Sequence, residues 1–133
     1  MSKPLRFLVV DDEPDVEMLF RQKFRKELKS GLLELAFALS GIDALEILRC
    51  NDPPDVVYIF SDINMPGMSG LELLERVTDE FPQIKVSMIS AYGDQENYNR
   101  AMESGARGFF TKPIDFVTLK EEITSLLIDR KNI

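Results

Sequence analysis

The chain has 133 residues, of which 44% are hydrophobic and 29% are charged, which is typical of one soluble globular domain spanning residues 1–133. Its formal net charge of −7 argues against a direct nucleic-acid surface, because binding to a phosphate backbone needs clustered Lys and Arg. Histidine is absent and Cys50 is the only cysteine, which excludes Ser-His-Asp and Cys-His catalysis, imidazole metal sites and internal disulfides.

Short apolar runs predict five strands. The first run ends in acidic residues and is too short for a signal-peptide core or a membrane span. We therefore expect a cytoplasmic protein with no membrane contact. The predicted strands cover residues 7–10, 35–39, 56–60, 86–89 and 108–111.

Each predicted strand is followed by apolar residues at helical spacing, which predicts five helices. These helices cover residues 16–28, 42–49, 71–81, 95–104 and 116–127. The first helix is rich in cations, and their interleaving with apolar residues favours the solvent-facing side of one amphipathic helix. Those cations are Arg21, Lys23, Arg25, Lys26 and Lys29.

Strands alternating with helices predict an α/β fold. The alternation implies parallel pairing with right-handed crossovers, and hence a doubly wound five-stranded sheet with five helices that cover both of its faces. No linker or repeat divides the chain. In sheets of this kind ligands bind beyond the carboxyl ends of the strands, so the strand ends are the place to look for a site.

Polar residues stand at four of these strand ends. Asp11 and Asp12 follow the first strand, Asp62 the third, Ser90 the fourth and Lys112 the fifth. Crowded carboxylates raise one another's pKa, which favours a bound cation, and an oxygen-only ligand set suits Mg²⁺. Lys112 and Ser90 are candidates to contact phosphoryl oxygens.

A carboxylate in this setting can itself attack phosphorus and form an aspartyl phosphate. Asp62 is the favoured acceptor because it closes the central strand, whereas Asp11 and Asp12 are adjacent and suit metal binding. Taken singly, an acid at a strand end could merely cap the next helix, and Phe109 could be only a core residue. The combination of these residues at neighbouring strand ends favours a phosphoryl-accepting site.

Four segments in chain order resemble the signature segments of response-regulator receiver domains of two-component systems. They are LVVDDEP, SDINMPGMSG, MISAYG and GFFTKPI, and together they span almost the whole chain. The resemblance implies the flavodoxin-like receiver fold with strand order 2-1-3-4-5. It also implies a cis peptide bond between Lys112 and Pro113.

Carried over residue by residue, the resemblance makes Asp62 the phosphoacceptor and Lys112 the phosphate-contacting lysine. It makes Asp11, Asp12 and Asp62 the Mg²⁺ ligands, together with the backbone carbonyl of Asn64.

Two further positions are implied to form the switch. Ser90 matches the hydroxyl that turns toward the phosphoryl group, where the family often has Thr, and serine keeps the donor. Phe109 matches the coupled aromatic residue, where the family often has Tyr. Without a polar tip, an inward pose costs Phe109 less, so we expect the ring to pack inward even without phosphate.

The resemblance also implies the partners. The phosphoryl donor would be a sensor histidine kinase or a histidine phosphotransfer protein, and the fourth helix, fifth strand and fifth helix would bind a downstream effector. The protein would be a signalling phosphoacceptor with self-catalysed transfer and autodephosphorylation only, not an enzyme. Two alternatives stay open: a phosphate-independent interaction module of the same fold, and a small aspartyl-phosphate phosphotransferase. The chain lacks an insertion long enough for the lid that the latter would need.

Overall fold

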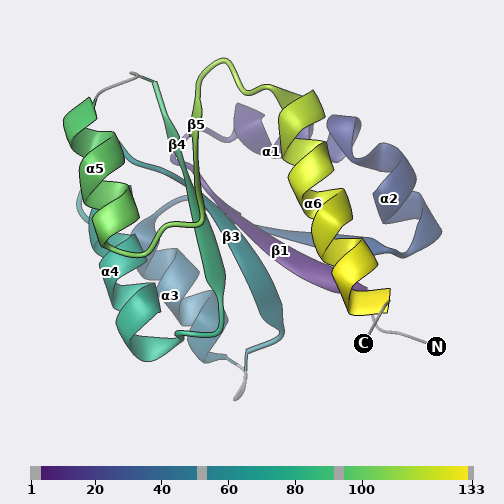
Figure 1. The fold of residues 1–133 in the computed structure, drawn as a ribbon, viewed down its shortest axis with the longest axis horizontal. Coiled ribbons are helices and arrows are strands. Elements are labelled where there is room, and N and C mark those ends of the chain that lie inside the picture. The colour runs from purple at the N-terminus through teal and green to yellow at the C-terminus, as the bar shows by residue number, and fades with distance from the viewer. Residues whose placement is uncertain (1–3, 51–53, 92–94, 132–133) are drawn as a thin grey trace.

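The computed structural model describes residues 4–50, 54–91 and 95–131, with side chains described up to residue 125. Five parallel strands form one sheet in the order β2-β1-β3-β4-β5, as the resemblance implies (Figure 1). The strands are β1 Leu5–Val10, β2 Leu33–Ala38, β3 Val56–Asp62, β4 Lys85–Ser90 and β5 Gly108–Thr111. All five predicted strands are confirmed, with ends that differ by no more than two residues.

These residues also form six helices, so the predicted number of five is wrong. They are α1 Asp15–Lys23, α2 Arg25–Ser30, α3 Gly41–Arg49, α4 Gly70–Glu80, α5 Gln95–Glu103 and α6 Phe116–Lys131. Within the described ranges, no helix has the length and hydropathy needed to cross a bilayer.

The extra helix arises because the first predicted helix bends at Phe24, where φ is −105° and ψ is 21°. Backbone hydrogen bonds still run through the bend, from Phe24 N to Phe20 O at 3.0 Å and from Leu28 N to Phe24 O at 2.9 Å. The apolar residues therefore keep their four-residue spacing on both sides of it. Hydrophobic periodicity could not reveal the division for this reason.

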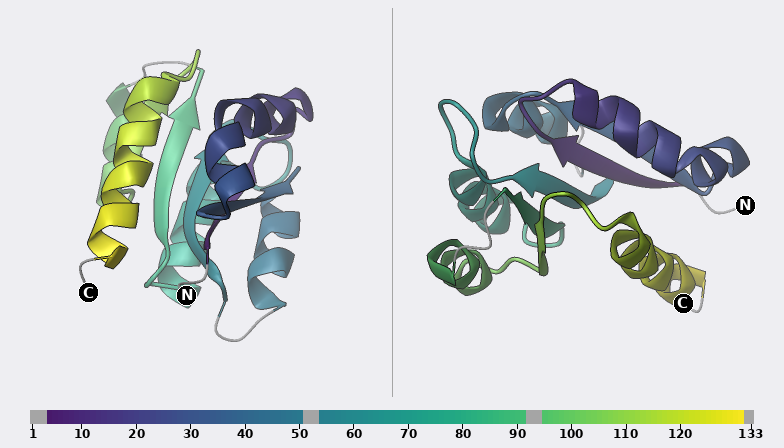
Figure 2. Two further views of the ribbon diagram at one scale, coloured as in Figure 1. Left: turned by 90° about the vertical axis from the view of Figure 1, so that its right-hand side faces the viewer. Right: turned by 90° about the horizontal axis from the view of Figure 1, so that it is seen from above.

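Helices cover both faces of the sheet, with α1, α2 and α6 on one side and α3, α4 and α5 on the other (Figures 1 and 2). Successive strand residues point to opposite faces. Phe7 and Val9 accordingly pack with the first group of helices, while Leu8 and Val10 pack with the second. Burial on both faces explains why the inner strands are rich in apolar residues.

Aromatic rings join α6 to the first helix pair. The rings of Phe20 and Phe24 are stacked with centroids 6.0 Å apart, and the ring of Phe116 lies edge-on to both, at 5.2 Å and 6.3 Å. Because Phe20 and Phe24 are buried, these contacts hold the start of α6 against α1.

Candidate functional site

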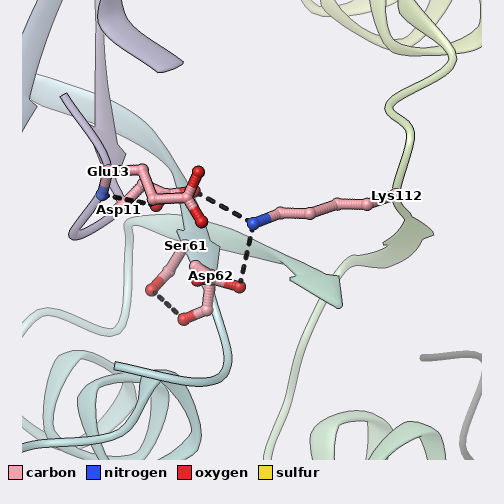
Figure 3. Close-up of polar contacts among 5 residues, drawn as sticks. All are labelled: Asp11, Glu13, Ser61, Asp62 and Lys112. Carbon is pink, nitrogen blue, oxygen red and sulfur yellow. Dashed lines mark hydrogen bonds and ion pairs between the residues drawn. The ribbon is translucent and has the colours of Figure 1, made fainter. Parts of the chain in front are cut away.

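The predicted polar residues meet at the carboxyl edge of the sheet. Asp62 is the last residue of β3, and Asp11 directly follows β1, where its amide donates to Ala38 O at 3.1 Å. Lys112 directly follows β5, and its side chain reaches back across the sheet edge. Figure 3 shows the side chains of Asp11, Asp62 and Lys112 pointing toward one another.

Three carboxylates lie close enough to share one cation. Asp11, Asp12 and Asp62 each offer an oxygen within 4.8 Å of the others. Asp11 and Asp62 are only 5% exposed, whereas Asp12 faces solvent. Buried carboxylates at this spacing repel one another, and an oxygen-only ligand set suits a hard divalent ion that keeps some of its waters, such as Mg²⁺.

The Lys112 ammonium lies between the two buried acids. Its Nζ is 3.4 Å from Asp11 Oδ2 and 3.6 Å from Asp62 Oδ1. Burial opposes the charge on Lys112, but Asp62 and Asp11 outweigh burial and raise the pKa of the ammonium. The lysine therefore stays charged beside the acids. The Lys112–Pro113 peptide bond is cis, as the resemblance implied.

The pKa of Asp62 is raised to about 6. Burial is the main cause, and the charges of Asp11 and Asp12 add to it, while Lys112 acts in the opposite direction. One ammonium thus does not balance three carboxylates. A divalent cation would supply the missing positive charge, so these residues fit a Mg²⁺ site.

Helix capping does not account for these acids. No side chain caps α1, and Asp11 Oδ1 accepts instead from Glu13 N at 2.9 Å, outside the helix (Figure 3). Helix α4, which follows β3, is capped by Ser69, whose Oγ accepts from Glu72 N at 3.2 Å. Asp62 is therefore left available for other chemistry.

Two residues that sequence reasoning missed support the backbone of Asp62. Ser61 Oγ donates to Asp62 O at 3.0 Å (Figure 3). Gly70 begins α4 so close to the strand end that a Cβ there would lie 2.0 Å from Asp62 O. Only glycine permits this approach, so the last residue of SDINMPGMSG is required by the backbone of the site.

The structure places the remaining predicted residues around the same edge. Ser90 ends β4 and is fully buried, and its carbonyl accepts from Lys112 N at 2.8 Å. Asn64 lies two residues after Asp62 with an exposed side chain. Phe109 in β5 is half-buried, and its ring is edge-on to the ring of Tyr98 in α5 at 5.5 Å. The last two residues of MISAYG lie outside the described residues.

Comparison with known proteins supports the geometric reading. Residues 7–124 match the response regulator receiver domain family. The chain is 31% identical to sporulation initiation phosphotransferase F of Bacillus subtilis over 96% of this chain and 97% of that one. It is 34% identical to response regulator protein PilR of Pseudomonas aeruginosa over 90% of this chain, but it spans only 25% of PilR.

A solved structure agrees with both relatives. The response regulator TrrA of Thermotoga maritima, crystallised with Mg²⁺ and BeF, has a TM-score of 0.74 and 29% identity over 92% of this chain and 98% of that one. The strand order, the acid cluster and the family match point the same way. The chain belongs to the receiver domain family of two-component response regulators.

Proposed function

We propose that this receiver domain accepts a phosphoryl group on Asp62 with the help of Mg²⁺. One observation carries the proposal: Lys112 Nζ lies within 3.6 Å of a buried carboxylate that shares a possible cation site with two other acids. The ligands would be the carboxylates of Asp11, Asp12 and Asp62 and the backbone carbonyl of Asn64. The name of the Bacillus relative, a phosphotransferase, and the Mg²⁺–BeF complex of the Thermotoga relative support this assignment.

The donor would be a phosphohistidine on a sensor histidine kinase or a histidine phosphotransfer protein. A carboxylate oxygen of Asp62 attacks phosphorus, the P–N bond breaks, and the imidazole leaves with the electron pair. Lys112 offsets negative charge on the transferred oxygens. Bound Mg²⁺ would supply further positive charge to these oxygens. Water later cleaves the acyl phosphate, so the protein acts as a signalling phosphoacceptor and not as a multiple-turnover enzyme. We propose that it does so in the cytoplasm.

Phosphorylation would change the surface formed by α5, β5 and α6, which are the fourth predicted helix, the fifth strand and the fifth predicted helix. Ser90 is buried at the end of β4, one residue beyond Ile89, which pairs with Asp62 in the sheet, and its hydroxyl would donate to the phosphoryl group. The ring of Phe109 in β5 would then shift together with α5, because it packs on Tyr98 of that helix. A downstream effector domain or protein would bind this surface. We also propose that residues 1–133 act as one receiver domain.

Acetyl phosphate provides the test. The protein should incorporate one acid-stable, alkali-labile phosphoryl group in the presence of Mg²⁺, and chelation of the metal should prevent it. Asp62→Asn should abolish incorporation, while the exposed Asp79→Asn, on the outer side of α4, should leave it unchanged.

The outcomes separate the alternatives. Absence of incorporation by the folded wild-type protein would favour the phosphate-independent module. Continuous turnover of many phosphate esters would favour the phosphotransferase. Incorporation that persists in Asp62→Asn would place the acceptor elsewhere.

A further inference from the structure

An acidic chain carries an unusual concentration of basic side chains on one face. An open hollow of about 410 Å³ lies where α1 and α2 approach α6, and five of the six residues that line it are basic. The chain as a whole has 23 acids and only 16 Lys and Arg. The lining residues are Gln22, Lys23, Arg25, Lys26, Lys29 and Lys120.

Most of these cations have no acidic partner. Lys120 Nζ pairs with Glu27 Oε2 at 3.5 Å. Across the part of the chain that the structure describes, no ion pair or hydrogen bond involves the side chains of Lys23, Arg25, Lys26 or Lys29. Gathering like charges without partners is unfavourable for folding, so a chain with surplus acids has a reason to disperse them. Their grouping indicates an external partner.

Two of the lysines that line the hollow lie over aromatic rings. Lys23 Nζ lies 5.9 Å from the centroid of Phe116, and Lys120 Nζ lies 5.4 Å from that of Phe24. Because Phe24 is buried and Phe116 half-buried, each ring belongs to the α1–α6 contact rather than to a mobile surface. The two ammonium groups are thus positioned before a partner arrives, which lowers the entropic cost of binding.

The charge distribution along α1, acidic at its start and basic at its end, selects the kind of partner. The first turn of α1 carries Asp15 and Glu17, of which Glu17 pairs with Arg21 at 3.0 Å, and Asp11 and Asp12, which precede this helix, share the sheet-edge cluster with Asp62. A long polyanion such as duplex DNA, or a flat anionic membrane, would cover both the basic hollow and this acidic edge. A short acidic segment of a protein would meet the hollow alone.

We propose that the hollow between α2 and α6 is a docking site for a short segment rich in Asp and Glu on a partner protein. The site is separate from the phosphoacceptor, because its lining residues include none of Asp11, Asp62 and Lys112, whose ion pairs are with one another. The proposal therefore does not depend on phosphorylation.

A labelled deca-glutamate peptide tests the site by fluorescence anisotropy. The wild-type protein should bind it, and affinity should fall as ionic strength rises toward the physiological range, where the screening length is about 8 Å. Reversing three charges in the hollow, with Lys23→Glu, Lys26→Glu and Lys29→Glu together, should weaken binding by about tenfold or more.

A matched variant controls for net charge. Arg76→Glu, Lys85→Glu and Arg100→Glu make the same change at exposed positions outside the hollow and should leave affinity within about twofold of the wild type. Circular dichroism establishes that both triple variants are folded. Equal loss in both variants, or no binding by the wild type, overturns the proposal. So does tighter binding of a short DNA duplex, or of vesicles with equal parts phosphatidylcholine and phosphatidylglycerol, through the same three lysines.

Discussion

The hydroxyl of Tyr58 in β3 donates a hydrogen bond of 2.8 Å to Glu122 Oε1 in α6. Because its single proton serves that bond, the phenol oxygen accepts from Ser87 Oγ in β4. Arg107 Nε approaches the same Glu122 oxygen at 3.5 Å. Burial, supported by the Glu122 carboxylate, raises the pKa of Tyr58 above its usual value, so the phenol remains a donor. This network joins the strand that carries Asp62 to the last helix.

Tyr58→Phe should destabilise the protein by about 1–3 kcal/mol, because it leaves the fully buried Ser87 hydroxyl without its acceptor and removes a donor from Glu122. Urea unfolding measures the change. Hydrogen exchange should also rise in the first half of α6.

A double variant distinguishes the network from simple loss of a polar group. If Ser87→Ala accompanies Tyr58→Phe, the unpaired hydroxyl disappears and part of the stability should return. A destabilisation below about 0.5 kcal/mol for Tyr58→Phe alone would mean that the network contributes little to folding.

Much of the fold could be predicted because it depends on local patterns. Apolar runs gave the strands, and the rule that ligands bind at carboxyl strand ends located Asp62 and Lys112. The Tyr58 network could not be predicted in the same way. Tyr58 sits in an apolar strand, and Glu122 lies 64 residues later, so only the packing of α6 brings them together. One signal was present, since a buried tyrosine needs a partner for its hydroxyl.

Gly70→Ala should disturb the site through the backbone. The added Cβ would lie 2.0 Å from Asp62 O and 2.9 Å from Ile63 Cα, so α4 or the end of β3 must move. We expect a loss of stability of about 1–3 kcal/mol or more and weaker Mg²⁺ binding. Isothermal titration calorimetry measures the affinity.

Ser69→Ala is the matched control for this substitution. It removes the N-cap of the same helix, which costs about 1 kcal/mol, but it places no atom against Asp62. Mg²⁺ affinity should therefore survive in Ser69→Ala. Equal affinities in the two variants would show that the close approach of α4 does not position Asp62.

The raised pKa of Asp62 gives a pH dependence to the metal-free protein. The folded carboxyl holds its proton up to about pH 6, whereas the unfolded one releases it near 3.8. Stability from this group is therefore fully present below the unfolded pKa and is lost as pH rises through about 6, by an amount on the order of 2–3 kcal/mol. Thermal unfolding in a chelator, compared across this range with Asp62→Asn, isolates the contribution.

The same charge balance predicts how Mg²⁺ and Asp62→Asn act on stability. At about pH 7.5 the carboxyl of Asp62 is above its pKa of about 6 and ionised, so Mg²⁺ should raise the unfolding temperature, and it should do so less at about pH 5, where protons compete for Asp62. Asp62→Asn removes one repelling charge from beside Asp11 and Asp12. The metal-free variant should therefore be more stable than the metal-free wild type at the higher pH and should gain little from Mg²⁺. A variant that still gained as much as the wild type would show that the ion is held without Asp62.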